Sequence, residues 1–219
     1  MSIAYNLQNI KSKLPSNVTL VAVSKTKPIS DLMVAYDAGQ RIFGENKIQE
    51  MAEKWEQMPK DIQWHFIGHV QTNKVKFIAE YVSLVHGVDS FKLLEEINKQ
   101  AKKHNRVINC LLQIHIAEEE TKFGLNEEEL KTILNSEDFK NLENIKIIGL
   151  MGMATFTDNQ NQIKKEFTHL KTIFDNRKII NTSNCQLNTI SMGMSGDYQL
   201  AIECGSTMVR IGSSIFGGR

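Results

Sequence analysis

The stretch that decides the fold reads Thr19-Leu20-Val21-Ala22-Val23-Ser24-Lys25-Thr26-Lys27-Pro28. Its first half is an aliphatic, β-branched run with the length and composition of a strand buried on both faces of a parallel sheet. Pro28 favours an extended residue before it, and Ser30 is a candidate N-cap for a helix over residues 31–38. Lys25 is therefore predicted at the carboxyl end of a strand, where parallel α/β folds bind their ligands.

The rest of the chain repeats this order of apolar strand, polar turn and amphipathic helix. Eight strands are predicted, at residues 19–24, 41–43, 63–67, 81–85, 107–116, 145–151, 189–192 and 207–211. Helices are predicted at residues 3–13, 31–38, 47–56, 72–79, 90–104, 127–136, 159–178 and 198–203. Eight such units predict an α/β fold, a single (β/α)8 TIM barrel over residues 1–219. The alternative is a doubly wound open sheet, which we disfavour because no GxGxxG motif follows the first strand.

Composition excludes several classes of partner. The chain has 26 basic and 25 acidic residues, and a net charge of +1 gives no electrostatic reason to bind nucleic acid or an acidic membrane. The three cysteines are an odd number without CxxC spacing, which is typical of free thiols in a reducing compartment. The N-terminus does not resemble a signal peptide, and no apolar stretch reaches the ~18 residues of a membrane span. We expect a soluble cytoplasmic protein.

The amine of Lys25 has two interpretations. Lys25 and Lys27 are two residues apart, so in an extended segment they lean to the same side. A neighbouring cation lowers the pKa of a lysine, and this favours a nucleophilic amine. The alternative is a pair of solvated lysines after a strand.

The next two strands end in further polar residues. Asn46 follows Phe43-Gly44-Glu45 and either caps the next helix or contacts a ligand. His65 is predicted on the opposite face from Trp64 and Phe66, and a hydrogen-bonded core histidine is its simpler interpretation. The histidines form no HExxH motif, so we predict no metal site.

The last two turns of the predicted barrel indicate a phosphate site. They read Ser191-Met192-Gly193-Met194-Ser195-Gly196-Asp197 and Arg210-Ile211-Gly212-Ser213-Ser214. Barrels frequently bind phosphate through the loops after strands seven and eight, because glycines expose backbone N–H groups and hydroxyls add donors. Arg210 is predicted to point into the barrel, where its charge needs a partner such as Glu203. Together with Lys25, this pattern suits a pyridoxal phosphate site.

Long blocks of the sequence also resemble a known family, the pyridoxal phosphate homeostasis proteins, which are similar to the barrel domain of alanine racemase without its second domain. The matching blocks are residues 21–28, 43–46, 64–69 with 73–74, 191–195 and 205–212. The resemblance implies that Lys25 forms a Schiff base with pyridoxal 5'-phosphate and that Arg210 faces the pyridine nitrogen. It further implies that the phosphate is held by Ser195, Gly212 and Ser213 and that the pocket is lined by Asn46 and His65. Ser213 stands where threonine is common, which keeps the hydroxyl.

The function expected from this resemblance is cofactor storage and delivery, with a role in amino-acid and keto-acid balance and no robust catalysis. An arginine at the pyridine nitrogen keeps that nitrogen unprotonated, so the ring is a poor electron sink. Racemisation needs a second acid or base, which alanine racemase takes as a tyrosine from its additional domain; none of Tyr5, Tyr36, Tyr81 or Tyr198 lies in a matching segment. Apo enzymes that need the cofactor are the expected partners, and a monomer is expected. The alternatives are a racemase of low activity and a Schiff-base lyase or aldolase acting on a phosphorylated substrate.

Overall fold

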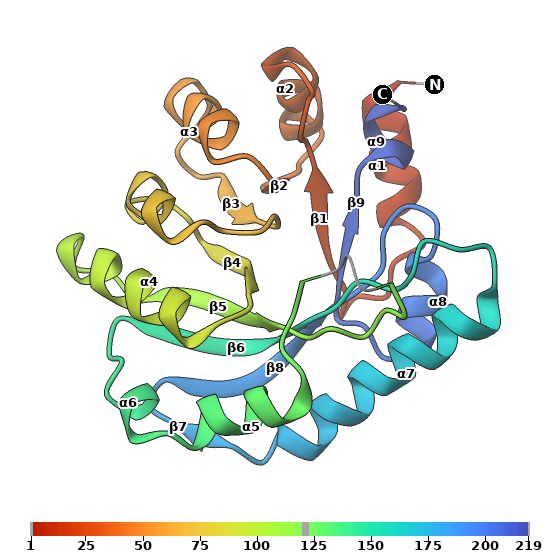
Figure 1. The fold of residues 1–219 in the computed structure, drawn as a ribbon. Coiled ribbons are helices and arrows are strands. Elements are labelled where there is room, and N and C mark those ends of the chain that lie inside the picture. Colours follow the sequence, from red (N-terminus) through yellow and green to blue (C-terminus); the bar gives the residue numbers. More distant parts are fainter. Residues whose placement is uncertain (1, 120–122, 219) are drawn as a thin grey trace.

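The computed structural model describes residues 2–119 and 123–218 of the chain, and it contains a closed barrel of parallel strands (Figure 1). The barrel strands are β1 (Thr19–Val23), β2 (Ile42–Glu45), β3 (Gln63–Phe66), β4 (Leu84–Val88), β5 (Ile108–Gln113), β6 (Ile145–Met151), β8 (Cys185–Ser191) and β9 (Met208–Ile211). Each strand pairs in parallel with the next, and β9 pairs with β1 to close the ring. The prediction of a (β/α)8 TIM barrel is confirmed.

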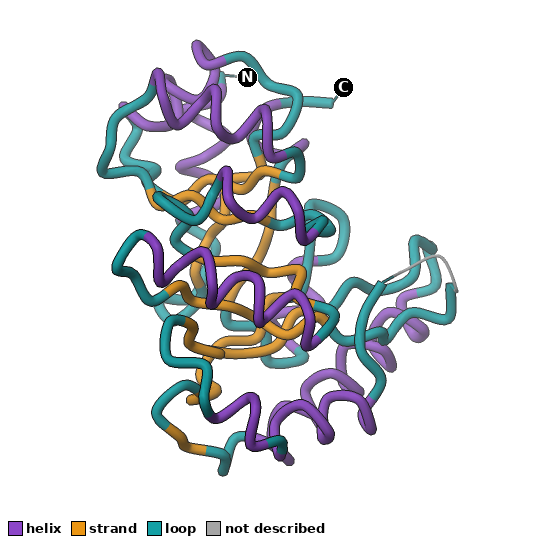
Figure 2. The backbone as a smooth tube through the Cα atoms, turned by 60° about the vertical axis from the view of Figure 1, so that its left-hand side comes forward, coloured by secondary structure: helices purple, strands orange, loops and turns teal. Residues whose placement is uncertain are grey.

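Helices follow the strands and lie outside the barrel (Figures 1 and 2). The longer ones are α1 (Ile3–Lys11), α2 (Ile29–Asp37), α3 (Ile48–Gln57), α4 (Phe91–Lys103), α5 (Glu127–Asn135) and α7 (Gln160–Arg177). The short ones are the 3-10 helix η1 (Thr72–Phe77), α6 (Glu137–Lys140), α8 (Tyr198–Glu203) and α9 (Ser213–Phe216). The two ends of the described chain lie side by side, because α9 packs on α1.

Three differences between the structure and the predicted elements concern the site and its neighbouring strands. Strand β4 begins at Leu84 instead of residue 81, because Tyr81 and Val82 donate backbone hydrogen bonds to Ile78 and continue the turn after η1. Strand β8 begins at Cys185, four residues earlier than predicted, and pairs with the two-residue antiparallel strand β7 (Asn181–Thr182). Helix α2 begins at Ile29 after an extended Pro28, so Ser30 lies inside the helix. The shift of β4 places His86 within a barrel strand.

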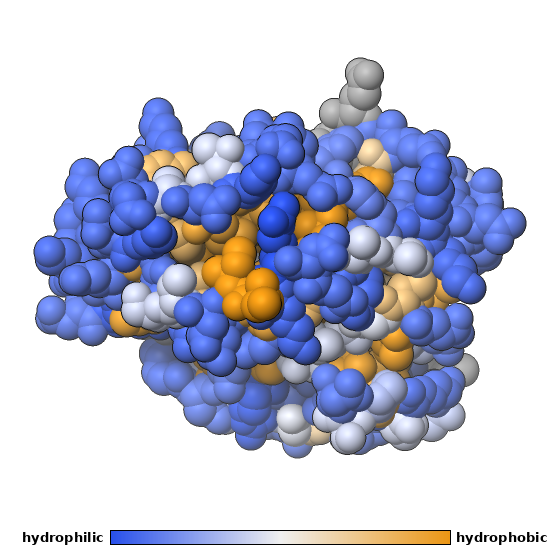
Figure 3. Space-filling view, turned by 90° about the horizontal axis from the view of Figure 1, so that it is seen from below, coloured by the Kyte–Doolittle hydropathy of each residue, from blue (hydrophilic) through white to orange (hydrophobic). Residues whose placement is uncertain are grey.

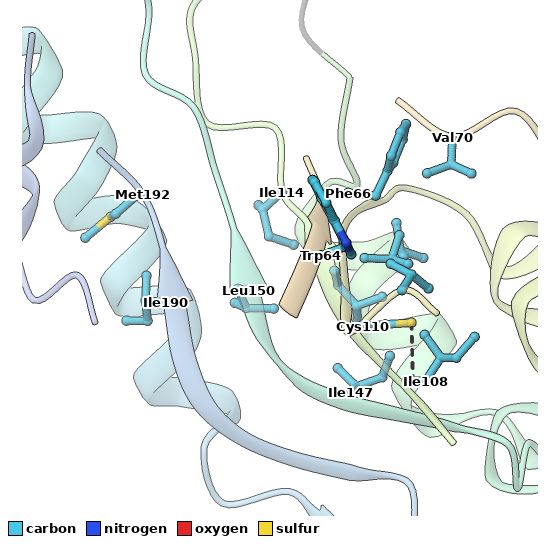
Figure 4. Close-up of a cluster of buried hydrophobic side chains, with 14 of the residues drawn as sticks. Trp64, Phe66, Val70, Ile108, Cys110, Ile114, Ile147, Leu150, Ile190 and Met192 are labelled. Carbon is cyan, nitrogen blue, oxygen red and sulfur yellow. Dashed lines mark hydrogen bonds between the residues drawn. The ribbon is translucent and has the colours of Figure 1, made fainter. Parts of the chain in front are cut away.

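The main hydrophobic core lies between the strands and the outer helices. Figure 4 shows part of it, with Trp64 and Phe66 of β3 beside Cys110 of β5 and Ile147 of β6. These side chains are at most 1 % exposed. Truncating Trp64 to alanine is expected to cost about 3–5 kcal/mol of folding free energy.

A second, smaller apolar cluster fills the inside of the barrel. It consists of Val21, Leu84, Leu111, Met151 and Met208, which come from five different strands. Side chains two residues further along a strand point to the same face. The next inward residues of β4, β5 and β9 are therefore His86, Gln113 and Arg210, and they form a polar layer above the apolar one.

The face of the molecule seen from below is mainly hydrophilic (Figure 3). Figure 3 shows the face seen from below, where a small apolar patch near the centre is surrounded by hydrophilic residues. Among the described residues, none of the helices is both long and apolar enough to cross a bilayer.

Candidate functional site

A cavity of about 730 Å³ opens at the carboxyl ends of the barrel strands. Six of the seven predicted site residues line it, namely Lys25, Asn46, Ser195, Arg210, Gly212 and Ser213. The seventh predicted residue, His65, is not among the described residues that line the cavity. Its side chain is 4 % exposed and contacts His86 inside the barrel. The cavity is also lined by Gln113 and Asp197, which the sequence prediction did not include.

The backbone on both sides of Lys25 is held by helix α3. Lys54 donates a hydrogen bond from Nζ to the Ser24 carbonyl oxygen at 2.8 Å, and the Thr26 N–H donates to Glu50 Oε1 at 2.5 Å. Thr26 has a φ of 64°, a left-handed conformation that is uncommon for a β-branched residue. These contacts offset the cost of that conformation and fix the direction in which the residue before Thr26 leaves the strand.

A buried ion pair supports these contacts. Lys54 Nζ lies 2.7 Å from Glu45 Oε1 and 2.7 Å from Glu50 Oε1, and Ser24 Oγ donates to Glu45 Oε1 at 2.6 Å. Burial raises the pKa of the Glu45 carboxyl, and the charge of Lys54 opposes this shift. The Glu45 carboxylate beneath the Lys25 turn is thus paired through Oε1, whereas its Oε2 is buried without a hydrogen-bond partner among the described residues.

The two turns predicted to bind phosphate meet at one side chain. Ser195 Oγ accepts hydrogen bonds from the backbone N–H groups of Gly212, at 3.2 Å, and Ser214, at 3.5 Å. The first turn depends on Gly193, whose φ of 97° suits glycine. Its carbonyl oxygen accepts from the Arg210 N–H at 2.9 Å. Hydroxyls and backbone N–H groups therefore gather at the same side of the cavity, as an anion site needs.

Arg210 lies at the floor of the cavity with three neutral oxygens as its recorded partners. Nη1 donates to the carbonyl oxygen and Oγ of Ser191 at 2.8 and 2.6 Å, and Nη2 donates to the Gly152 carbonyl oxygen at 3.1 Å. Burial lowers the pKa of Arg210 to about 10, against the opposing effect of Asp197, so the guanidinium is charged at neutral pH. Glu203, the partner suggested from the sequence, is not among these contacts.

Two buried histidines lie next to Ser191 in the inside of the barrel. His86 Nδ1 lies 3.0 Å from Ser191 Oγ, and His86 Nε2 lies 3.0 Å from His65 Nδ1. Burial lowers the pKa of His65 to about 3 and that of His86 well below its usual range. The sequence prediction missed His86 because it ended the strand at residue 85, although His86 stands two residues after the inward Leu84.

The sequence allows Asn46 either to cap the next helix or to contact a ligand. The residue that precedes α3 is Lys47, and no side-chain hydrogen bond caps this helix. Asn46 instead lines the cavity, and its Oδ1 is buried without a hydrogen-bond partner among the described residues. An unsatisfied buried amide oxygen costs free energy unless a ligand or water supplies a donor.

These residues fit a ligand with an aldehyde, an anionic phosphate and a ring nitrogen. Lys25 supplies the amine, the turns joined at Ser195 supply N–H and hydroxyl donors, and Arg210 supplies a guanidinium from the floor. The fold and site thus define a class of protein, the (β/α)8 barrels whose cavity at the carboxyl ends of the strands is lined by a lysine amine and by the donors of an anion site.

Comparison with known proteins agrees with this class. The sequence profile of the family described as "Alanine racemase, N-terminal domain" matches residues 1–219. The pyridoxal phosphate homeostasis protein of Haemophilus influenzae is 39% identical over 232 aligned residues, which cover 100% of this chain and 97% of that protein. The chain therefore belongs to the pyridoxal phosphate homeostasis proteins, within the wider family of the alanine racemase N-terminal domain.

Solved structures show the same relationship. PipY of Synechococcus elongatus, with pyridoxal phosphate (PLP) bound, is 32% identical with a TM-score of 0.89, covering 99% of this chain and 100% of that one. The same protein without PLP gives a TM-score of 0.92. Alanine racemase of Bartonella henselae, at 16% identity and a TM-score of 0.73, shares the fold over 58% of its own length.

Proposed function

We propose that this chain binds pyridoxal 5'-phosphate in the barrel cavity through a covalent bond between Lys25 Nζ and the aldehyde carbon. One observation carries the proposal: Lys25 and the two turns joined at Ser195 line the same cavity. PipY, which is 32% identical, has PLP bound in its structure, and this supports the assignment. When bound, the cofactor would supply an electrophilic aldehyde carbon, with which a primary amine such as that of Lys25 condenses with loss of water.

The other site residues orient the cofactor. Ser195 and Ser213 would hold the phosphate, and the Gly212 N–H, which donates to Ser195 Oγ in this structure, would be a further donor. A Cβ at position 212 would meet the Val23 carbonyl oxygen at 3.0 Å. Arg210 would face the pyridine nitrogen, and Asn46, whose Oδ1 is buried without a partner among the described residues, would contact the cofactor. His65 does not contact the cofactor directly in this proposal; it supports the site through its contact with His86.

We further propose that the protein stores and delivers the cofactor and does not turn over substrates at an enzyme-like rate. The guanidinium of Arg210 is charged at neutral pH and can only donate, so it leaves the pyridine nitrogen unprotonated. An unprotonated ring withdraws few electrons, which disfavours carbanion chemistry. The relatives named pyridoxal phosphate homeostasis proteins support a role in the supply of PLP. We include a role in amino-acid and keto-acid balance in the same proposal.

The test of this function is transfer. The PLP-loaded protein is mixed with an apo enzyme that needs PLP, and recovery of that enzyme's activity is timed. We expect recovery, together with no exchange of the α-hydrogen of alanine in heavy water above the rate of free PLP. Exchange at an enzyme-like rate would indicate a racemase, and failure of the apo enzyme to recover would contradict delivery.

The oligomeric state and the cellular location are further proposals. We expect a monomer, which light scattering of the purified protein tests. We place the protein in the cytoplasm because its cysteines, Cys110, Cys185 and Cys204, are free thiols. Fractionation of the source cells with antibody detection tests this location.

A further inference from the structure

We propose that His86 is a positioning residue for Arg210. It accepts the hydroxyl proton of Ser191 and so leaves the Ser191 oxygen as an acceptor for the guanidinium. The four side chains then form a hydrogen-bond chain with one fixed direction, from Arg210 through Ser191 and His86 to His65. The effect on the cofactor rests on the proposed function, whereas the hydrogen-bond chain is a property of the protein without cofactor.

Arg210 sets the direction of the hydrogen-bond chain. A guanidinium only donates, so the 2.6 Å contact between Arg210 Nη1 and Ser191 Oγ uses the serine oxygen as an acceptor. The Ser191 hydroxyl is fully buried, and its single hydrogen needs an acceptor of its own. The recorded group in reach is His86 Nδ1, at 3.0 Å. His86 Nδ1 therefore carries no proton.

The proton positions on His86 and His65 follow because both imidazoles are neutral. His86 is fully buried and faces Arg210 and His65, and both the burial and these neighbours disfavour a charged imidazole. A neutral imidazole without a proton at Nδ1 carries it at Nε2, which lies 3.0 Å from His65 Nδ1. His65 then accepts at Nδ1, and because burial also keeps it neutral, it carries its own proton at Nε2.

This arrangement fixes the guanidinium for a ligand. Three of the five N–H groups of Arg210 are used in its recorded contacts with Ser191 and Gly152, which leaves two for the cavity that Arg210 lines. If His86 carried its proton at Nδ1, it would donate to the same Ser191 oxygen as Arg210 and weaken that contact. Without His86, the Ser191 hydroxyl would lose its acceptor and turn toward other partners.

The first experiment uses the wild-type protein without cofactor. Histidine is labelled with ¹⁵N, and long-range correlation spectra report which ring nitrogen is protonated. We expect His65 and His86 to be neutral with the proton at Nε2, and exposed His104 provides the reference signal. A proton at Nδ1 of His86, or a charged His86 at neutral pH, would overturn the proposal whatever the cofactor does.

The second experiment compares His86→Asn with His86→Leu. The Asn amide oxygen can replace Nδ1 as the acceptor for Ser191, whereas Leu cannot. We expect His86→Leu to weaken PLP binding about tenfold or more, the value of a hydrogen bond to a charged group, and to shift the ¹⁵N resonance of the pyridine nitrogen. His86→Asn should retain wild-type affinity within about threefold and the wild-type shift.

The outcomes separate this inference from the proposed function. Equal affinity and equal pyridine shifts in wild type and His86→Leu would contradict the positioning role. A wild-type protein that binds no PLP would refute the proposed function, while the protonation of His86 would still be decided by the first experiment. Should His86→Leu fail to fold, the wild-type spectra still decide the protonation of His86, and a changed pyridine shift in His86→Asn would contradict the positioning role.

Discussion

Lys54 donates a hydrogen bond to the carbonyl oxygen of Ser24, at 2.8 Å, immediately before the lysine that we assign to the cofactor. The same ammonium forms ion pairs with Glu45, which is fully buried, and with Glu50, which accepts a hydrogen bond from the N–H of Thr26. Helix α3 therefore sets the position of the Lys25 turn through one buried cation.

Replacing Lys54 by methionine tests this support. The change leaves the Glu45 carboxylate buried without its cation, and we expect the free energy of unfolding in urea to fall by about 3–5 kcal/mol. Lys140→Met is the matched control. Lys140 pairs with Glu137 on the exposed surface, and its loss should change stability by no more than about 0.5 kcal/mol. Equal stability of Lys54→Met and the wild type would show that the ion pair is not needed.

Ser195→Ala tests the phosphate site. The variant removes the hydroxyl that joins the turns of Gly212 and Ser214, so the affinity for PLP should fall about tenfold. Pyridoxal, which lacks the phosphate, is the control ligand and should bind wild type and variant equally. Titration followed by absorbance measures both. A loss of the same size for pyridoxal would place Ser195 away from the phosphate.

The buried histidines predict a dependence of stability on pH. The pKa of His65 is lowered from about 6.5 to about 3, so below pH 6.5 the unfolded chain binds a proton that the folded chain does not. Stability therefore falls as the pH is lowered from about 6.5 toward 3, by about 1.4 kcal/mol per pH unit for this residue. His86, whose pKa is also lowered, adds to the same slope.

Urea unfolding at several pH values between about 6.5 and 5 measures this slope. We expect His65→Gln to reduce it by about 1.4 kcal/mol per pH unit, because one buried neutral histidine has been removed. His104→Gln, at an exposed position, should keep the wild-type slope. An unchanged slope in His65→Gln would mean that His65 is protonated in the folded protein.

The sequence was informative where function depends on residues at strand ends. Lys25 and Ser195 lie in the turns after predicted strands. Arg210 lies one residue before the end of β9, where strand alternation places its guanidinium inside the barrel. The eight-unit rhythm predicted the closed barrel because every unit must bury one face against its neighbours.

The parts that sequence reasoning missed depend on contacts between distant elements. Lys54 lies on the predicted helix over residues 47–56, and local pattern does not show that its amine reaches Ser24 and Glu45. His86 falls outside the predicted strand because the mainly apolar run of residues 81–85 already has the length of a strand. The strand is shifted because Tyr81 stacks on Trp55, with ring centroids 4.3 Å apart, and so belongs to the preceding turn.

The central claim is that Lys25 bonds covalently to the cofactor. The protein is loaded with PLP, reduced with borohydride and digested, and mass spectrometry locates the added pyridoxyl group. We predict that the group is found on Lys25 and that Lys25→Ala, treated identically, loses both the label and the visible absorption band. A pyridoxyl group on another lysine of the wild type, or an unchanged band in Lys25→Ala, would contradict the account.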